Sequence, residues 1–306
     1  MTPDPAFGTD PLAFAAHPPP PRRRATAREV LLVEPSGFRL SGETATDNAY
    51  MDLARSVDPT RALAQHRALA QAIHAHARLP VRVFDGDPGS PDAVFCNNVF
   101  ATVPGRFIVG AMRHPERQRE GRRQDLIEAF RAEGREVLRI DRVPDAVAEL
   151  TGPLVVDRAR GIGFHGLSER CNEVGAQAMH AAFDLERSLA FPLAAGEYHT
   201  NVVLAVLAGR AAVVHEASVG SAVCAALDAL YGPHVLRIDD AEKSAFVANC
   251  IALTPDQCWM SAHAERALSP RSRAALRAAG FTPYTVEIDE IEKAGGSLRC
   301  CVGEVF

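Results

Sequence analysis

The end of the chain carries the residues whose types and spacing most directly suggest chemistry. Gly295 and Gly296 precede Cys300, and an apolar stretch then runs to Phe306. Paired glycines let the backbone turn and approach a ligand closely, and a cysteine thiolate is a strong nucleophile. A lone cysteine more often fills a core, because free cysteine is among the most buried residue types. We predict that Cys300 opens a short strand and is a nucleophile, an interpretation that depends on the residues upstream.

A second regularity places asparagines at matching positions. An aromatic residue is followed three positions later by asparagine in three places, at Phe95 and Asn98, Tyr198 and Asn201, and Phe246 and Asn249. Because asparagine is disfavoured in strands, its recurrence favours polar side chains that converge on a shared central space. The alternative is that each asparagine bonds only its local backbone.

The elements that must position these residues recur along the chain as strand, tight turn, strand, amphipathic helix and returning strand. The hairpins are expected at 99–109, 154–164, 202–214 and 250–260, the helices at 122–133, 174–185, 219–231 and 270–279, and the returning strands at 137–140, 188–191, 234–238 and 282–288. A further unit begins with a strand at 29–33 and a helical region at 47–78, and the strand 300–306 can close it. Periods of about 45 to 65 residues predict a ring or array of five α/β units.

Composition excludes several classes of function. The 306 residues carry a net charge of -5, which gives no basic surface for nucleic acid or an anionic membrane. No apolar run approaches the roughly 18 residues that span a bilayer, and no secretory signal is present, so we expect a cytoplasmic protein. Seven cysteines without regular spacing predict neither a disulfide framework nor a metal site. Residues 1–26, rich in proline and arginine, are expected to be a disordered leader, and residues 27–306 a single domain.

Five blocks of the sequence resemble the guanidine-modifying superfamily, which includes arginine deiminases, dimethylarginine hydrolases, amidinotransferases and succinylarginine dihydrolase. They are FRLSGETATDN at 38–48, PDAVFCNNVF at 91–100, the segment 149–172, YHTN at 198–201 and GGSLRCCVGEVF at 295–306. The closest pattern is that of the arginine-deiminase-related proteins, including citrulline-utilisation hydrolases. The resemblance covers nearly the whole chain after the leader, and it implies the pentein fold, a propeller of five ββαβ units.

The resemblance also implies catalytic roles. Cys300 would attack the central carbon of a guanidinium or ureido group, and the covalent intermediate would split one hard displacement into two easier ones. His199 would be the general acid and then the base, and Glu149 would orient His199. Glu149 is followed by Leu150, where the relatives' motif has glycine. The implied enzyme needs neither a cofactor nor a metal.

Substrate-binding residues are implied in the same way. Arg117 and Arg170 match positions that hold the α-carboxylate in relatives, which suits the planar fork of arginine. Asp92 resembles an acidic residue that dimethylarginine hydrolases place before their F-x-E-D block, and Asn97 and Asn98 stand in the F-x-N-N motif. The segment 38–48 resembles a substrate-covering loop.

Asn98 and Asn201 occupy positions where deiminases have aspartates that hold the guanidinium. Two carboxylates select a cation, whereas an amide both donates and accepts hydrogen bonds. The sequence therefore favours hydrolysis of an arginine-type amino acid in which a neutral ureido group, as in citrulline, is also accepted.

Two alternatives stay open at this stage. An amidinotransferase would use the same residues with an amine in place of water. A non-catalytic pentein scaffold, as in the ribosomal anti-association factor that shares the fold, would need none of the three catalytic side chains. A small-molecule substrate is the expected partner, nucleic acid and membrane are not, and a homodimer is compatible with the sequence.

Overall fold

The computed structural model describes residues 6–16 and 19–306, and the strands within these ranges form five separate sheets. Each sheet has an antiparallel pair and a third strand that is parallel to one member of that pair. In the order of the units, the sheets are β16 (Gly303–Val305), β2 (Glu29–Val33) and β3 (Val81–Phe84); β4 (Phe100–Val103), β5 (Arg106–Val109) and β6 (Glu136–Arg139); β7 (Leu154–Asp157), β8 (Ile162–Leu167) and β9 (Arg187–Pro192), with β1 (Phe7–Gly8) at its edge; β10 (Leu204–Leu207), β11 (Ala211–Val214) and β12 (Val235–Arg237); and β13 (Ile251–Thr254), β14 (Gln257–Ser261) and β15 (Thr282–Val286). The predicted hairpins and returning strands are confirmed.

The first unit is built from both ends of the chain. Strand β16 pairs antiparallel with β2, with Gly303 opposite Leu31, and β3 lies parallel on the other side of β2. The expected closure by the C-terminal segment is therefore confirmed. Cys300, however, does not open this strand: it lies in a single helical turn, α13 (Leu298–Cys301), before β16 begins. Four residues are too few to show a helical period, so the sequence pattern could not separate this turn from the strand that follows.

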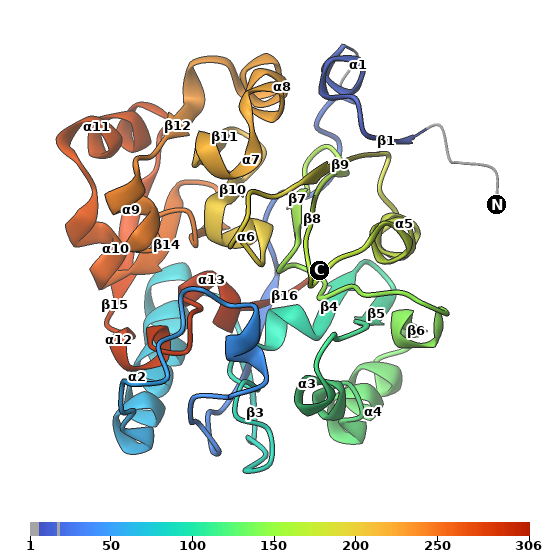
Figure 1. The fold of residues 1–306 in the computed structure, drawn as a ribbon, viewed down its shortest axis with the longest axis vertical. Coiled ribbons are helices and arrows are strands. Elements are labelled where there is room, and N and C mark those ends of the chain that lie inside the picture. The colour runs from blue at the N-terminus through green and yellow to red at the C-terminus, as the bar shows by residue number, and fades with distance from the viewer. Residues whose placement is uncertain (1–5, 17–18) are drawn as a thin grey trace.

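The longer helices lie on the outside of the molecule, and the strands lie nearer its centre (Figure 1). The α-helices are α1 (Pro11–Ala15), α2 (Pro59–Ala72), α3 (Pro115–Glu120), α4 (Gln124–Ala132), α5 (Glu173–Ala182), α6 (Thr200–Val203), α7 (Glu216–Val219), α8 (Ser221–Tyr231), α9 (Asp240–Ser244), α10 (Ala262–Ala267), α11 (Pro270–Ala278), α12 (Asp289–Glu292) and α13. Short 3-10 turns are η1 (Thr44–Thr46), η3 (Cys96–Asn98), η4 (Ile140–Arg142) and η5 (Gly232–His234), and a π-helical turn, η2 (Ile73–Ala77), extends α2.

Local sequence explains where these helices begin and which face they bury. The side chain of Asp58 accepts hydrogen bonds at the start of α2, where Pro59 is the first helical residue. In α4 the buried residues Leu126, Ile127 and Phe130 fall on one face, as a period of 3.6 requires. Phe130 stacks on Phe107 of β5 at 4.4 Å between ring centroids, so the core of this unit lies between its helix and its sheet.

Part of the expected leader is ordered. Residues 7 and 8 form β1, which pairs parallel with β9, and Asp10 caps α1, whose Phe14 is buried against Phe164. The expectation of disorder therefore does not hold for residues 6–16, because aromatic burial and a helix cap offset the proline-rich composition. Residues 1–5 and 17–18, which belong to the same expectation, lie outside the described residues.

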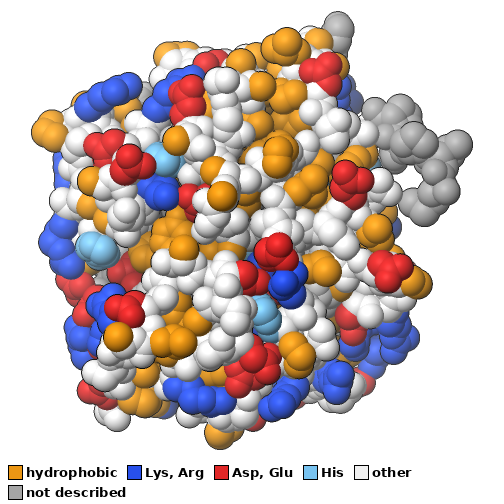
Figure 2. Space-filling view, in the orientation of Figure 1, with side chains coloured by type: hydrophobic (Ala, Val, Ile, Leu, Met, Phe, Trp, Pro, Cys, Tyr) orange, Lys and Arg blue, Asp and Glu red, His pale blue; other side chains and the backbone are white. Residues whose placement is uncertain are grey.

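Acidic and basic side chains alternate over the face seen in Figure 2, without a broad patch of one sign. None of the helices in the described ranges is long and apolar enough to cross a bilayer.

Candidate active site

The thiol of Cys300 lies in a buried polar cluster behind the glycine turn. Its Sγ atom receives a hydrogen bond from Nδ2 of Asn249 at 3.2 Å and lies 3.7 Å from Oδ1 of Asn201. Burial raises the pKa of the Cys300 thiol above its ordinary value of 9.0, although the bond from Asn249 and the nearby charge of Arg299 oppose this shift. The resting side chain is therefore a protonated thiol at neutral pH.

His199 and Glu149 form the predicted pair. Nε2 of His199 lies 3.0 Å from Oε2 of Glu149, and both side chains are buried. Burial lowers the pKa of His199, so the imidazole is neutral at neutral pH, even though Glu149 favours its charged form. Nδ1 of His199 has no hydrogen-bond partner among the described residues. A neutral ring that donates from Nε2 to Glu149 therefore leaves Nδ1 as a base.

The backbone just after Glu149 packs closely against His199 and includes a residue with positive φ. A Cβ atom on Gly152 would lie 2.6 Å from the ring of His199, so only glycine lets the imidazole lie against this turn. Leu150 has a φ of 37°, in the left-handed region that favours glycine. This conformation explains why the motif of the similar family has glycine at that position.

Arg170 holds the covering segment rather than presenting free donors. It donates to Oδ1 of Asp47 at 2.9 and 2.5 Å, to the carbonyl of Thr44 at 3.0 Å, and to both oxygens of Glu149 at 3.1 and 3.4 Å. Burial opposes ionisation of Glu149, but the charge of Arg170, the hydrogen bond with His199 and the charge of Arg117 together lower the pKa of Glu149 below its ordinary value. All five donors of Arg170 are used, so it has none left for a substrate carboxylate while Asp47 stays in place.

A cavity of about 20 Å³ lies in front of the thiol, and the predicted residues Cys300, His199, Asp92, Asn98, Arg117 and Arg170 line it together with Thr44, Asn48, Phe95, Tyr198, Ala294 and Gly296. A water molecule needs roughly 10 to 15 Å³. The cavity therefore has no room for an amino acid while Thr44 and Asn48 cover it.

The wall opposite the histidine carries one acceptor and one donor. Oδ1 of Asp92 is buried without a hydrogen-bond partner among the described residues, and burial raises the pKa of this carboxyl. Nη1 of Arg117 donates to Oδ1 of Asn98 at 2.9 Å, which leaves Nδ2 of Asn98 without a partner in the same part of the chain. Arg117 itself is held by both carboxylate oxygens of Glu120, at 3.1 and 3.0 Å.

Two predicted substrate-binding residues lie behind this wall. Asn97 and Asn201 both donate to the carbonyl of Thr151, at 3.3 and 2.8 Å, and neither lines the cavity. Oδ1 of Asn201 instead lies 3.7 Å from the thiol of Cys300. Contact of Asn201 and Asn97 with a substrate stays a prediction.

Two residues of the site were not among the predicted site residues. Asn249 bonds the thiol; the aromatic-x-x-Asn motif had placed it among the converging asparagines, without assigning it a role. Asp47 joins Arg170 to His114, whose Nε2 lies 3.1 Å from Oδ2 of Asp47. Asp47 stands inside a recognised block, but nothing in its neighbours signals a contact with position 170.

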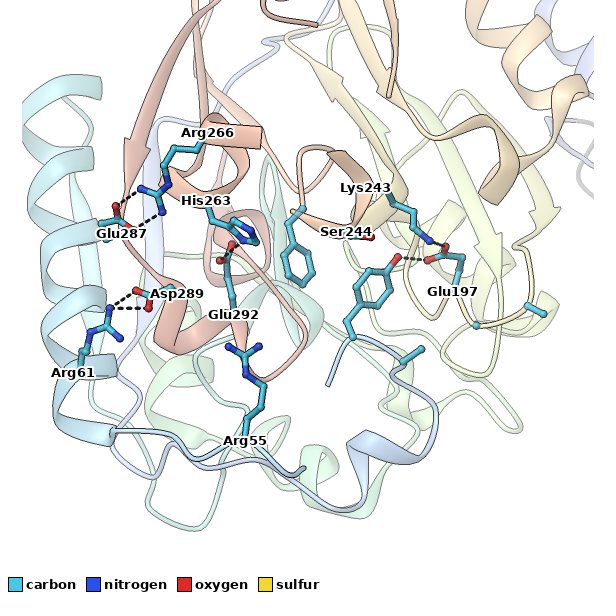
Figure 3. A pocket seen from close by; sticks show the side chains of 15 residues that line it. Arg55, Arg61, Glu197, Lys243, Ser244, His263, Arg266, Glu287, Asp289 and Glu292 are labelled. Atoms are coloured by element: carbon cyan, nitrogen blue, oxygen red, sulfur yellow. Dashed lines mark hydrogen bonds and ion pairs between the residues drawn. The ribbon is translucent and has the colours of Figure 1, made fainter. Parts of the chain in front are cut away.

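A larger cleft of about 930 Å³ lies on the other side of the covering segment, with Ala49 and Tyr50 in its wall. The hydroxyl of Tyr50 donates to Oε2 of Glu197 at 2.5 Å. Figure 3 shows Lys243 paired with Glu197, and His263 paired with Glu292. Glu292 also accepts a hydrogen bond from Ser297, at the start of the helical turn that carries Cys300. The residues from Asn48 to Tyr50 therefore separate the open cleft from the closed cavity.

The chain is similar in sequence to a known protein family and to one of its characterised members. The profile of the family described as N,N dimethylarginine dimethylhydrolase, eukaryotic, matches residues 34–306. The N(G),N(G)-dimethylarginine dimethylaminohydrolase of Mycobacterium tuberculosis (strain ATCC 25618 / H37Rv) is 27% identical over 308 residues, which cover 98% of this chain and 93% of that protein.

Solved structures share the fold. The N-terminal domain of ArgZ bound to substrate, from an arginine dihydrolase of the ornithine-ammonia cycle in Cyanobacteria, superposes with a TM-score of 0.77 at 19% identity, over 90% of this chain and 97% of that domain. This chain spans 40% of the longer ArgZ chain. A dimethylarginine dimethylaminohydrolase adduct with S-methyl-L-thiocitrulline gives a TM-score of 0.69 at 19% identity, over 91% of this chain and 100% of that chain. The predicted superfamily and a mixed α/β fold of the pentein type are confirmed.

Proposed function

Since the chain belongs to the N,N-dimethylarginine dimethylhydrolase family of guanidino-modifying enzymes, we propose that it hydrolyses a guanidino or ureido C–N bond of an arginine-type amino acid through Cys300. The observation that carries this proposal is the convergence of Cys300 and His199 on one cavity, with Glu149 behind the histidine. The substrate is a small molecule, and the catalytic domain comprises residues 27–306.

The first half of the reaction transfers the substrate to the thiol. Nδ1 of His199 takes the proton of Cys300 while Sγ forms a bond to the central carbon of the substrate. The resulting imidazolium is stabilised by Glu149 and gives its proton to the departing nitrogen as the C–N bond breaks. A cationic guanidinium in the cavity favours the thiolate, which offsets the effect of burial on its pKa.

The second half releases the product. His199, again neutral, takes a proton from water as the water oxygen attacks the central carbon. The bond from carbon to Sγ then breaks, and the thiol recovers its proton from the imidazolium. Each step has a donor and an acceptor among the residues of the cavity, so neither a metal nor a cofactor is part of the proposal.

Asp92 and Asn98 supply the groups that would recognise the planar guanidino or ureido group of the substrate. The free Oδ1 of Asp92 accepts a hydrogen bond from an N–H of the substrate, and the free Nδ2 of Asn98 donates to an oxygen. A ureido group offers both partners, and a guanidinium offers donors alone. This pattern supports acceptance of a ureido substrate beside arginine-type cations.

Substrate entry requires the covering segment to move, since the cavity of about 20 Å³ is too small for an amino acid and its lining includes Thr44 and Asn48 of that segment. Opening would join the cavity to the cleft beside Tyr50 and would free Arg170 from Asp47. We propose that Arg170 then binds the α-carboxylate, as its motif implies, and that the five units close into a propeller around this site. The contacts of β16 with β4, β7 with β10, and β10 with β13 support that arrangement.

The test is incubation with arginine, citrulline and dimethylarginine, each with and without an amine acceptor, followed by mass spectrometry of the products. Release of citrulline or ornithine, with ammonia or dimethylamine, supports hydrolysis. Transfer of the amidino group to the amine identifies a transferase instead. Absence of turnover and of any adduct on Cys300 would refute the proposal, with the Cys300→Ser variant as the blank.

A further inference from the structure

A second cavity, of about 590 Å³, is lined largely by arginines and lies apart from the catalytic one. Its wall contains Arg23, Arg24, Arg28, Val103, Pro104, Arg106, Val156, Arg158, Gly161, Phe183, Asp184, Leu185 and Phe306. None of these residues lines the catalytic cavity. The volume is within the usual range of about 300 to 1,000 Å³ for small-molecule sites.

Acidic side chains pair with some of the arginines of this cavity but not with all of them: Arg23 pairs with Glu186 at 3.3 Å and Arg106 with Glu136 at 3.7 Å, both partners lying outside the lining. Asp184 is the one acidic residue among those lining it, and it pairs with Arg23 at 3.4 Å. Arg24 donates to the carbonyls of Thr26 and Ala27 but has no carboxylate partner in residues 6–16 and 19–306. Arg28 makes neither an ion pair nor a side-chain hydrogen bond within the same ranges. The guanidinium groups of Arg24 and Arg28 therefore line the cavity without an ion pair among the described residues.

A third arginine, Arg158, is buried and shares its carboxylate partner with another arginine. The side chain of Arg158 is 9% exposed, and its Nε has no hydrogen-bond partner among the described residues. Its carboxylate contact is Oε2 of Glu304 at 3.5 Å, and that same oxygen accepts from Arg299 at 3.1 Å. One carboxylate thus serves two arginines. A buried cation with an unused donor is costly unless a partner is supplied.

The apolar part of the wall limits the shape of a partner. The guanidinium of Arg158 lies 4.4 Å from the ring centroid of Phe306 and 5.4 Å from that of Phe183. Leu185 and Val156 complete the wall beside these rings. A ligand that reaches Arg158 would therefore pack a small apolar body against the two rings while its charged ends meet the arginines.

We propose that this cavity binds a small anion with at least two carboxylate or phosphate groups, one held by Arg158 and the other by Arg24 and Arg28. Arginine suits such groups because its planar fork binds either of them with two hydrogen bonds. The site uses no residue of the proposed reaction, so it can be tested whether or not that reaction is correct.

Titration calorimetry with citrate and with pyrophosphate, at constant ionic strength, is the test. We expect saturable binding of at least one probe with a stoichiometry of one. Arg28→Ala should weaken it about tenfold, since a charge-assisted hydrogen bond is lost, and Arg28→Lys should recover part of the affinity. Arg28 is exposed, so its replacement should leave the fold intact.

The matched control is Arg277→Ala, which removes an exposed arginine from α11, away from this cavity. It should leave the affinity unchanged, and Cys300→Ser should also bind normally. An equal loss in Arg277→Ala and Arg28→Ala would mean that the probes sense net charge alone, and the proposal would fail. It would also fail if neither probe binds, or if an oligonucleotide binds at these arginines while both small anions do not.

Discussion

Nη1 of Arg117 donates to Oδ1 of Asn98 at 2.9 Å, and this contact fixes which end of the amide faces the substrate. The oxygen of Asn98 is occupied by the arginine, so the group left for the cavity is the Nδ2 donor. The cavity wall therefore offers a donor from Asn98 and an acceptor from Asp92. A ureido group can bind both, whereas a guanidinium has donors only.

Asn98→Asp should therefore shift preference towards guanidinium substrates. One carboxylate oxygen would keep the contact with Arg117, and the other would replace the free donor with a charged acceptor. We expect the ratio of kcat/KM for arginine over citrulline to rise, a comparison that cancels general losses of reactivity. A flat or falling ratio in a folded, active variant would contradict this assignment.

Asn201→Asp is the matched comparison. The Nδ2 atom of Asn201 donates to the carbonyl of Thr151 at 2.8 Å, and its Oδ1 lies 3.7 Å from the thiol. A carboxylate there would face a carbonyl oxygen and would raise the pKa of Cys300 further. We expect slower turnover of both substrates without a change in the ratio of their kcat/KM values. The sequence assigned substrate preference to both Asn98 and Asn201, and this result would assign it to Asn98 alone.

The adjacent cysteines should behave differently. Cys300→Ser is expected to abolish turnover, and Cys301→Ser to retain most of it. Successive residues of a helical turn point about 100° apart, and the Cys301 thiol bonds the carbonyl of Ser297 at 3.6 Å rather than facing the cavity. Intact-protein mass spectra should show a trapped adduct on the wild type and on Cys301→Ser. The reverse pattern of activities would assign the nucleophile to Cys301.

Arg117→Ala should lower the stability of the folded protein. Burial already raises the pKa of Glu120 to about 7, and loss of Arg117 would leave a buried carboxylate unpaired, at a cost of about 3 to 5 kcal/mol. When the pKa of a carboxyl is higher in the folded than in the unfolded protein, the free energy of unfolding falls as pH rises above the unfolded pKa, here 4.5. The deficit in urea unfolding should therefore be larger at pH 8 than at pH 5.

Adding Glu120→Gln should restore much of that stability, because it removes the unpaired charge. In this double variant the amide of Asn98 is no longer anchored, and we expect the substrate concentration for half-maximal rate to rise about ten- to a hundredfold. Full stability of the Arg117→Ala single variant at pH 8 would show that the Arg117 and Glu120 pair does not support the fold.

The resting thiol should react slowly with small alkylating agents. Since burial raises the pKa of Cys300 above 9.0, the rate of modification by iodoacetamide should still be rising at pH 9. Subtracting the rate for Cys300→Ser removes the contribution of the other cysteines. A plateau near neutral pH would instead indicate a thiolate paired with a protonated His199 in the free enzyme.

Asp47→Asn should open the cavity more often. Burial opposes ionisation of Asp47, but hydrogen bonding and the charge of Arg170 lower its pKa, so the contact persists at neutral pH and weakens only as pH falls below about 3.8. Removing the charge should speed alkylation of Cys300 several-fold. The control is Asp52→Asn, which changes an exposed acid four residues after the end of the covering segment. Equal rates in all three proteins would mean that another contact holds the segment closed.

Much of the architecture was predictable because each unit carries local signals. Pro104 and Gly105 mark one hairpin turn, and Pro270 marks the start of a helix. The resemblance also predicted that Glu149 orients His199, and Oε2 of Glu149 lies 3.0 Å from Nε2 of His199. Asp47 and Arg170 are far apart in the chain, and a single sequence contains no distances between such residues.

The errors came from short elements and from composition. Cys300 lies in one helical turn because the backbone turns between Ser297 and the following strand, and no period is visible over four residues. The N-terminal segment was judged by its prolines and arginines. Burial of Phe14 and the N-terminal cap by Asp10 stabilise α1 in this segment.

The pairing of β2 with β16 has a consequence for the order of events during synthesis. The strand at 29–33 leaves the ribosome early, yet its antiparallel neighbour at 303–305 is made after every other unit. Until then β2 has an open edge, which is a template for wrong pairing, and Cys300, the proposed nucleophile, has not been translated. Such a long-range contact also slows folding, because a large loop must close before the pairing is gained. A site that contains Cys300 can therefore form only in a late step of assembly, when β16 pairs with β2.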